Sequence, residues 1–201
     1  MQDLIGKIKN ILINPFNFFE RIRKEKGIKD AFVYLAVLSL AMAVLGAVVG
    51  YLFQGISFDL VSKLLNIDVP RPEIGFGTIL FWAVLGYCAG LGLSFVWAAV
   101  LHVWILIFGG KANYAKTYQL AVYSATPRFV FGWIPIVNYF VWIYWLILLI
   151  IGTEKVHELS RLRAVLIYAI PAAALILVYI LIIVLAIVIL GSGILKGIPA
   201  A

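Results

Sequence analysis

Long runs of apolar residues, separated by short polar segments, dominate the chain. Four of these runs cover residues 31–53, 76–108, 135–151 and 164–190. A helix needs about 17 to 25 mostly apolar residues to cross the roughly 30 Å hydrocarbon core of a bilayer, and each run has at least that length. The pattern therefore predicts an all-α, polytopic membrane protein in which these runs are transmembrane helices.

A fifth stretch, residues 115–133, is less apolar because it contains Lys116, Thr117 and Gln119. The positive-inside rule decides whether it also crosses. If it crosses and the amino terminus is cytoplasmic, twelve lysines and arginines fall on inner segments and four on outer ones; if it re-enters, the division is nine against seven. The charges therefore predict a bundle of five transmembrane helices over residues 31–190, followed by a short outer C-terminal tail, 191–201.

Residues 1–30 combine an apolar helical pattern with many cations. Leu4, Ile8 and Ile11 recur at helical spacing, and a second short stretch follows Pro15. Seven basic residues against four acidic ones suit an anionic leaflet. We interpret the segment as a cytoplasmic, amphipathic interfacial helix that contacts anionic headgroups. The alternative is a partly helical tail whose apolar face packs on the rest of the protein.

The composition narrows the class of protein. Of the 201 residues, 65% are hydrophobic and 12% charged, whereas soluble domains are about 45–50% apolar and about 25% charged, so a water-soluble enzyme is excluded. The net charge of +7 follows from the topology and does not require a nucleic acid as partner. Cys88 is the single cysteine and the apolar runs contain no carboxylate, so we expect no catalytic site, no metal site and no cofactor.

A proline interrupts the fifth stretch near its end. Pro127 has no backbone N–H, so we expect the helix to kink or end there, with Ser124 and Thr126 bonding to the freed carbonyl groups. Residues 132–135, ending in Pro135, then link this helix to the next run. Two interpretations of the break stay open, a proline hairpin between two spans and a ligand or gating site on a broken helix.

Arg128 follows this break and should lie at or just below the outer interface. No carboxylate lies within an apolar run, so its partners are either lipid phosphates or the acidic residues Asp59, Asp68 and Glu73 of the outer loop. We favour Glu73, because it borders the second run. Simple snorkelling of the side chain to the interface is the alternative to a specific pairing or an anionic headgroup site.

His102 is the other ionisable group inside an apolar run. A neutral imidazole there can bond across helices to Tyr118, to Ser124 or to a free carbonyl group. A proton relay is the functional alternative, but the further titratable groups that it needs are missing from the run.

The segment His157-Glu158-Leu159-Ser160-Arg161 begins like a zinc-protease helix, but arginine stands where the second histidine should be. We expect a short, charged cytoplasmic helix here. His157, Glu158 and Arg161 then form a contact face for a soluble partner, or are simply solvated.

Small residues recur four apart in the first two runs. The pairs are Ala43 with Ala47, Gly46 with Gly50, and Gly86 with Gly90. This spacing lets two helix backbones approach closely in lipid, either within one chain or in a homodimer.

Short motifs follow one another from Gly109 onward. They are Gly109-Gly110, Tyr114, Thr117-Tyr118, Tyr123-Ser124-Ala125-Thr126-Pro127, Gly132-Trp133-Ile134-Pro135, Ile151-Gly152 and Val156-His157-Glu158-Leu159-Ser160. Their order and spacing resemble the Yip family of Ypt/Rab-interacting membrane proteins, and an Asn14-Pro15-Phe16 opening is similar to that of prokaryotic members. The resemblance implies a five-span membrane domain with a cytoplasmic N-terminus and, in eukaryotic members, Rab GTPase binding in vesicle traffic.

Together these observations favour a non-enzymatic membrane scaffold or adaptor in a prokaryotic plasma membrane. It would organise the bilayer or recruit a cytoplasmic protein. The alternative is a small transporter or channel for a solute or an ion that uses the broken third helix and the fourth helix.

Overall fold

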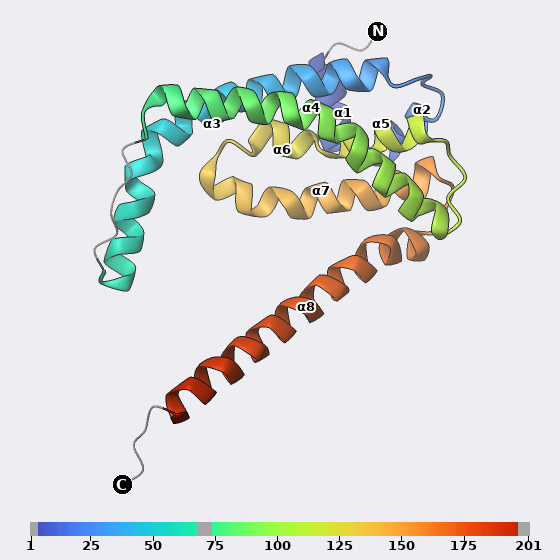
Figure 1. The fold of residues 1–201 in the computed structure, drawn as a ribbon. Helices are drawn as coiled ribbons and strands as arrows, with labels where there is room; N and C mark the ends of the chain where they lie inside the picture. Colours follow the sequence, from blue (N-terminus) through green and yellow to red (C-terminus); the bar gives the residue numbers. More distant parts are fainter. Residues whose placement is uncertain (1–3, 68–73, 197–201) are drawn as a thin grey trace.

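The computed structural model describes residues 4–67 and 74–196, and within these ranges the regular structure is helical. The helices are α1 (Leu4–Ile13), α2 (Pro15–Ile22), α3 (Lys29–Leu65), α4 (Phe76–Ile107), α5 (Tyr114–Ser124), α6 (Thr126–Phe131), α7 (Pro135–Val156) and α8 (Arg161–Lys196). Figure 1 shows α3 and α4 side by side above α7, with α5 and α6 between them, while α8 leaves the bundle.

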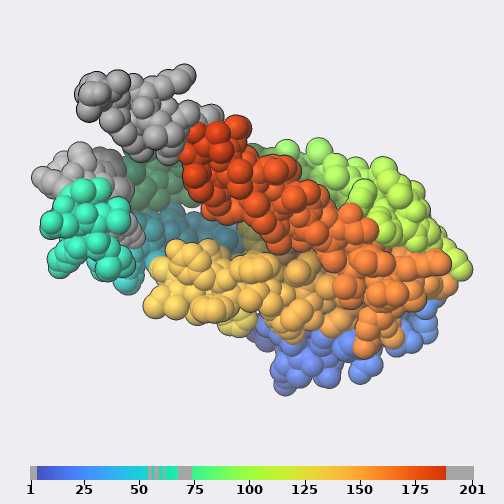
Figure 2. Space-filling model, turned by 90° about the horizontal axis from the view of Figure 1, so that it is seen from below, coloured from blue at the N-terminus to red at the C-terminus, as the bar shows by residue number. Residues whose placement is uncertain are grey.

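Four described helices are long and apolar enough to cross a membrane. The qualifying segments are Lys29–Phe53, Phe76–Ile107, Pro135–Val156 and Arg161–Val188. Their exposed side chains are mostly large and apolar, for example in α8, where every residue from 172 to 188 is exposed. Figure 2 shows α8 as a separate rod across one face of the molecule. Such a surface is stable only where lipid replaces water.

The boundaries of three helices differ from the predicted runs. α3 continues past residue 53 to Leu65 and changes direction after its apolar part (Figure 1). It ends where Asn66 adopts a left-handed conformation with φ of 50°. α7 continues to Val156, and α8 runs from Arg161 to Lys196, so part of the predicted tail is helical. Hydropathy marks where a helix is apolar and does not mark where its hydrogen bonding stops.

α5 and α6 form one broken helical segment at the centre of the bundle. α4 and α7 run in the same direction, and α5–α6 joins the end of α4 to the start of α7 (Figure 1). α5 contacts α3, α4 and α7, and residues 117–124 are all buried. Pro135 begins α7, where its missing N–H costs no hydrogen bond.

The N-terminal helices pack on the core. Ile11, Phe18, Phe19 and Ile22 are buried, and α2 contacts α7 and α5. Gly152 of α7 lies where α2 and α5 meet, since a Cβ there would be 2.2 Å from Leu120 Cδ1. Part of the apolar face of this segment therefore covers protein, as in the alternative that the sequence left open, while Leu4, Ile5 and Phe16 stay exposed.

Candidate functional site

The break between α5 and α6 is closed by side chains. Pro127 has no N–H for the carbonyl of Tyr123, and Thr126 Oγ1 donates to that oxygen instead at 2.6 Å. Tyr34 Oη of α3 donates to Thr126 Oγ1 at 2.9 Å, so both groups are paired although fully buried. Ser124 Oγ, the second expected partner of a freed carbonyl, is buried without a hydrogen bond among the described residues. The helix breaks at Ala125, two residues before the proline.

Tyr123 joins α5 to the N-terminal segment. Its hydroxyl donates to Glu25 Oε1 at 2.7 Å and accepts from Lys7 Nζ at 3.0 Å. Lys7 also pairs with Glu25 at 3.8 Å and lies 4.8 Å from the centroid of the Tyr123 ring. Each of the two charged side chains is 19% exposed, so they form a half-buried polar cluster with the Tyr123 hydroxyl.

Lys116 and Gln119 hold the turn after α2. Lys116 Nζ donates to the carbonyls of Ile22 and Glu25, and Gln119 Nε2 donates to the carbonyl of Gly27 at 2.7 Å. Lys116 thus bonds to the last carbonyl of α2, and both side chains fix the turn that follows this helix. Sequence reasoning missed this role. Lys116, Gln119 and Tyr123 are spaced by three and four residues, which places them on one helix face and could have revealed it.

A second polar chain links α4, α5 and the end of α7. His102 Nδ1 lies 2.8 Å from Thr117 Oγ1, and Thr117 Oγ1 lies 3.0 Å from His157 Nε2. His102 therefore pairs with Thr117 and not with the expected Tyr118 or Ser124; Tyr118 Oη lies 3.2 Å from Ser94 Oγ instead. Tyr118 meets α4 at Ser94 and Phe95, about two turns before His102 along that helix.

His157 is not part of an exposed contact face, contrary to expectation. It is fully buried, and its Nδ1 has no hydrogen-bond partner within the described chain. Burial, with a smaller contribution from His102, lowers the pKa of His157 to about 4. Gly110 makes this burial possible, since a Cβ there would lie 2.9 Å from the unpaired nitrogen.

Glu158 and Arg161 are exposed, but they do not share the expected short helix, since Glu158 lies in a turn and Arg161 begins α8. Glu158 has a left-handed backbone with φ of 56°, which separates α7 from α8. Glu158 pairs with Arg23 of the N-terminal segment, and Arg161 Nε lies 3.0 Å from Glu154 Oε2. Exposed pairs of this kind contribute little stability, yet they lie together at one end of the bundle.

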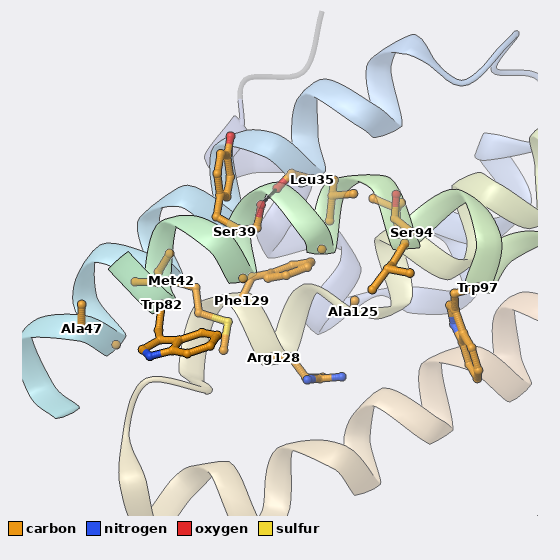
Figure 3. A pocket seen from close by; sticks show the side chains of 18 of the residues that line it. Leu35, Ser39, Met42, Ala47, Trp82, Ser94, Trp97, Ala125, Arg128 and Phe129 are labelled. Atoms are coloured by element: carbon orange, nitrogen blue, oxygen red, sulfur yellow. Dashed lines mark hydrogen bonds between the residues drawn. The ribbon is translucent and has the colours of Figure 1, made fainter. Parts of the chain in front are cut away.

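The described helices form a groove of about 830 Å³. Its walls come from α3, α4, α5, α6 and α7, and most of its lining is apolar. Figure 3 shows Arg128 extending between Trp82 and Trp97, with Met42 and Phe129 beside it. Arg128 is the one charged side chain among the described lining residues.

The guanidinium of Arg128 has no hydrogen bond or ion pair with the part of the chain that the structure describes. The expected partner Glu73 and the alternative Asp68 lie outside the described residues. An unpaired cation beside apolar side chains is costly in lipid unless water or an anion reaches it. Among the predicted site residues, Arg128 is therefore a charged group without a partner in the described fold, in addition to the neutral buried atoms Ser124 Oγ and His157 Nδ1.

The comparisons with known proteins give one match. No curated protein and no solved structure matches the chain significantly. A family model described as the Yip1 domain matches residues 9–183, from the first N-terminal helix to most of α8. The match covers the broken α5–α6 segment, the glycine pair before it and the buried His157, and the resemblance seen in the motifs is confirmed. The chain is an integral membrane protein that belongs to the Yip1 domain family.

Proposed function

We propose that this protein is a non-enzymatic Yip-type membrane scaffold that holds its N-terminal segment as a fixed platform for a cytoplasmic protein. The observation that carries the proposal is the set of half-buried polar contacts between α5 and residues 7–27. Lys7, Glu25 and the turn after α2 are tied to Tyr123, Lys116 and Gln119. These polar side chains are engaged with one another, so they serve the docking of the segment.

The exposed face of this platform is basic. Its exposed cations are Lys9, Arg21, Arg23, Lys24, Lys26 and Lys29. Such a face suits an acidic protein surface or anionic headgroups of the inner leaflet, each cation near such a leaflet contributing about 1 kcal/mol. The apolar residues Ile5 and Phe16 remain partly exposed beside it, with Ile5 at 73%. This combination supports contact of the segment with both a membrane surface and a partner.

The proposed topology has five spans, with the N-terminus in the cytoplasm of a prokaryotic cell and the C-terminus outside. The opposite directions of α5–α6 and its neighbours support it (Figure 1). Replacing Cys88 by alanine and adding Ser160→Cys places one thiol in the turn before α8. A membrane-impermeant maleimide should label it only in inside-out vesicles, while Gly75→Cys should react only in right-side-out ones. Labelling of both from one side contradicts five spans.

The partner is tested by photocrosslinking in intact cells. A photoreactive amino acid at Lys24, on the basic face, should give a discrete adduct with a cytoplasmic protein. The same probe at Leu177, exposed on α8, is the matched control and should give lipid adducts or none. A protein adduct that is equally strong from both positions, or absent from Lys24, contradicts an adaptor that uses this platform.

A second candidate is a small-solute or ion transporter or channel. The break at Ala125 and the unpaired Arg128 favour it, because transporters often place broken helices and charges at their binding sites. Flux of a small anion into proteoliposomes, lost in Arg128→Gln, would favour this candidate. Absence of flux together with the Lys24 adduct would favour the scaffold.

A further inference from the structure

The small residues of α3 and α4 line an open space. Gly46, Gly86 and Gly90 belong to the lining of the groove, and a Cβ added to any of them meets no atom within 4 Å. Glycines that serve close helix packing have a neighbouring backbone or side chain at that distance, as Gly152 has. These three glycines therefore keep a groove open in this chain.

The size and lining of the groove suit a lipid chain. Its volume of about 830 Å³ lies within the range of about 300–1,000 Å³ that small-ligand sites occupy. The hydroxyl groups of its lining are already used, since Ser39 donates to the carbonyl of Leu35, Ser94 bonds to Tyr118 and Tyr87 donates to the carbonyl of Ala36. Apolar contact is thus what the groove walls offer, apart from Arg128.

Arg128 supplies the single charge of the groove and has no partner in the described chain. It lines the groove together with Trp82, which is six residues from the start of α4, or about 9 Å along that helix. A long arginine side chain reaches the headgroup layer from such a depth. A guanidinium forms strong, paired hydrogen bonds with phosphate oxygens.

We propose that the groove binds one anionic phospholipid, with the phosphate on Arg128 and an acyl chain along Gly86 and Gly90. The chemistry of the site selects this occupant. A phospholipid offers both an apolar tail for the walls and an anion for the guanidinium, and a bilayer presents it at high concentration.

A second copy of the chain fits the groove less well. A helix from another copy could fill the space beside the glycines, but the predicted spans contain no Asp or Glu that could neutralise Arg128. Such a dimer would bury an unpaired charge. The homodimer remains a distinct outcome of the test.

Native mass spectrometry of the full-length protein in detergent tests the proposal. Dioleoyl phosphatidylglycerol and dioleoyl phosphatidylcholine are titrated in turn, so that the two lipids differ only in the headgroup. The wild type should retain one phosphatidylglycerol molecule about tenfold more tightly than phosphatidylcholine, as expected for one charge-assisted contact. Arg128→Gln should remove this preference, and Arg128→Lys should keep part of it. Arg163→Gln, an exposed arginine at the start of α8, should leave it unchanged.

Filling the groove provides an independent test. Gly90→Leu introduces a side chain into open space, so it should fold normally and weaken both lipids about tenfold or more by exclusion. Gly92→Leu is the matched control, because Gly92 is on the same helix, also meets no atom within 4 Å and does not line the groove. Equal retention of the two lipids by the wild type, unchanged binding in Arg128→Gln, or equal effects of the two leucine variants would overturn the proposal. A lipid-free dimer that Gly90→Leu dissociates would overturn it in favour of a second copy.

Discussion

Gly152 provides a sharp test of how the N-terminal segment is held. A Cβ on Gly152 would lie 2.2 Å from Leu120 Cδ1 and 2.9 and 3.0 Å from two ring carbons of Phe19. Leu120 and Phe19 are both fully buried, so neither can turn into open space. We predict that Gly152→Val pushes α2 away from α5 and α7.

The size of the effect follows from two opposing contributions. Overpacking a filled core costs about 1–3 kcal/mol, and valine, whose first carbon already falls inside contact distance, belongs at the upper end of this range. Replacing a glycine inside a helix stabilises that helix by about 0.5 kcal/mol. The net cost of docking α2 is therefore about 2 kcal/mol, which corresponds to about a 30-fold increase in the undocked population.

Hydrogen exchange of the α2 amides, followed by mass spectrometry in detergent, measures this population directly. Exchange over residues 18–22 should be about 30-fold faster in Gly152→Val than in the wild type. Gly92→Val is the matched control and should exchange at the wild-type rate, because its Cβ meets no atom within 4 Å. If α2 keeps wild-type protection in Gly152→Val, the close approach of the three helices is not what docks it.

Three further predictions concern buried polar groups, each read from thermal unfolding in detergent. The pKa of His157 is about 4 in the fold and about 6.5 in the unfolded chain, so protonation of this side chain favours unfolding. The free energy of unfolding should therefore fall as the pH drops below about 6.5, by about 2–3 kcal/mol at pH ~4.5. A His157→Gln variant with the same pH profile as the wild type would contradict this. Thr126→Val should lower the free energy of unfolding by about 2 kcal/mol, because it leaves the Tyr123 carbonyl and the Tyr34 hydroxyl without a partner. Thr126→Ser keeps the hydroxyl and should be close to the wild type in stability. Trp104→Phe should cost about 1–2 kcal/mol, because the indole donates at 2.7 Å to the carbonyl that Pro171 leaves without an N–H partner in α8. Pro171→Ala should remove most of that cost in a double-mutant cycle, and strict additivity would refute the pairing.

The membrane helices could be predicted from the sequence because their signal is local. The run 76–108 corresponds to α4, Phe76–Ile107, to within one residue. A break near Pro127 was equally local, since a missing N–H affects only its own turn. The sequence also shows that residues 115–133 contain polar side chains, but it does not show which groups those side chains bind.

The contacts of those polar residues depend on segments that are distant in the chain. Lys116 holds residues 22 and 25, more than 90 positions earlier, and nothing near Lys116 in the sequence identifies that turn. His157 illustrates the same limit, because its charged neighbours Glu158 and Arg161 indicated an exposed segment. The histidine is buried by α5 and Gly110, which come to it from another part of the bundle.

The sequence by itself determined the medium, the helical class and the family of this protein. Hydropathy adds up residue by residue, so a bilayer is implied before any helix is placed. Only the tertiary structure decided that the N-terminal helices cover the core, that His102 pairs with Thr117, and that Arg128 faces an open groove. Those outcomes depend on which helix faces meet. In lipid, apolar surface alone does not distinguish one helix face from another, so shape complementarity and the pairing of polar groups decide which faces pack together.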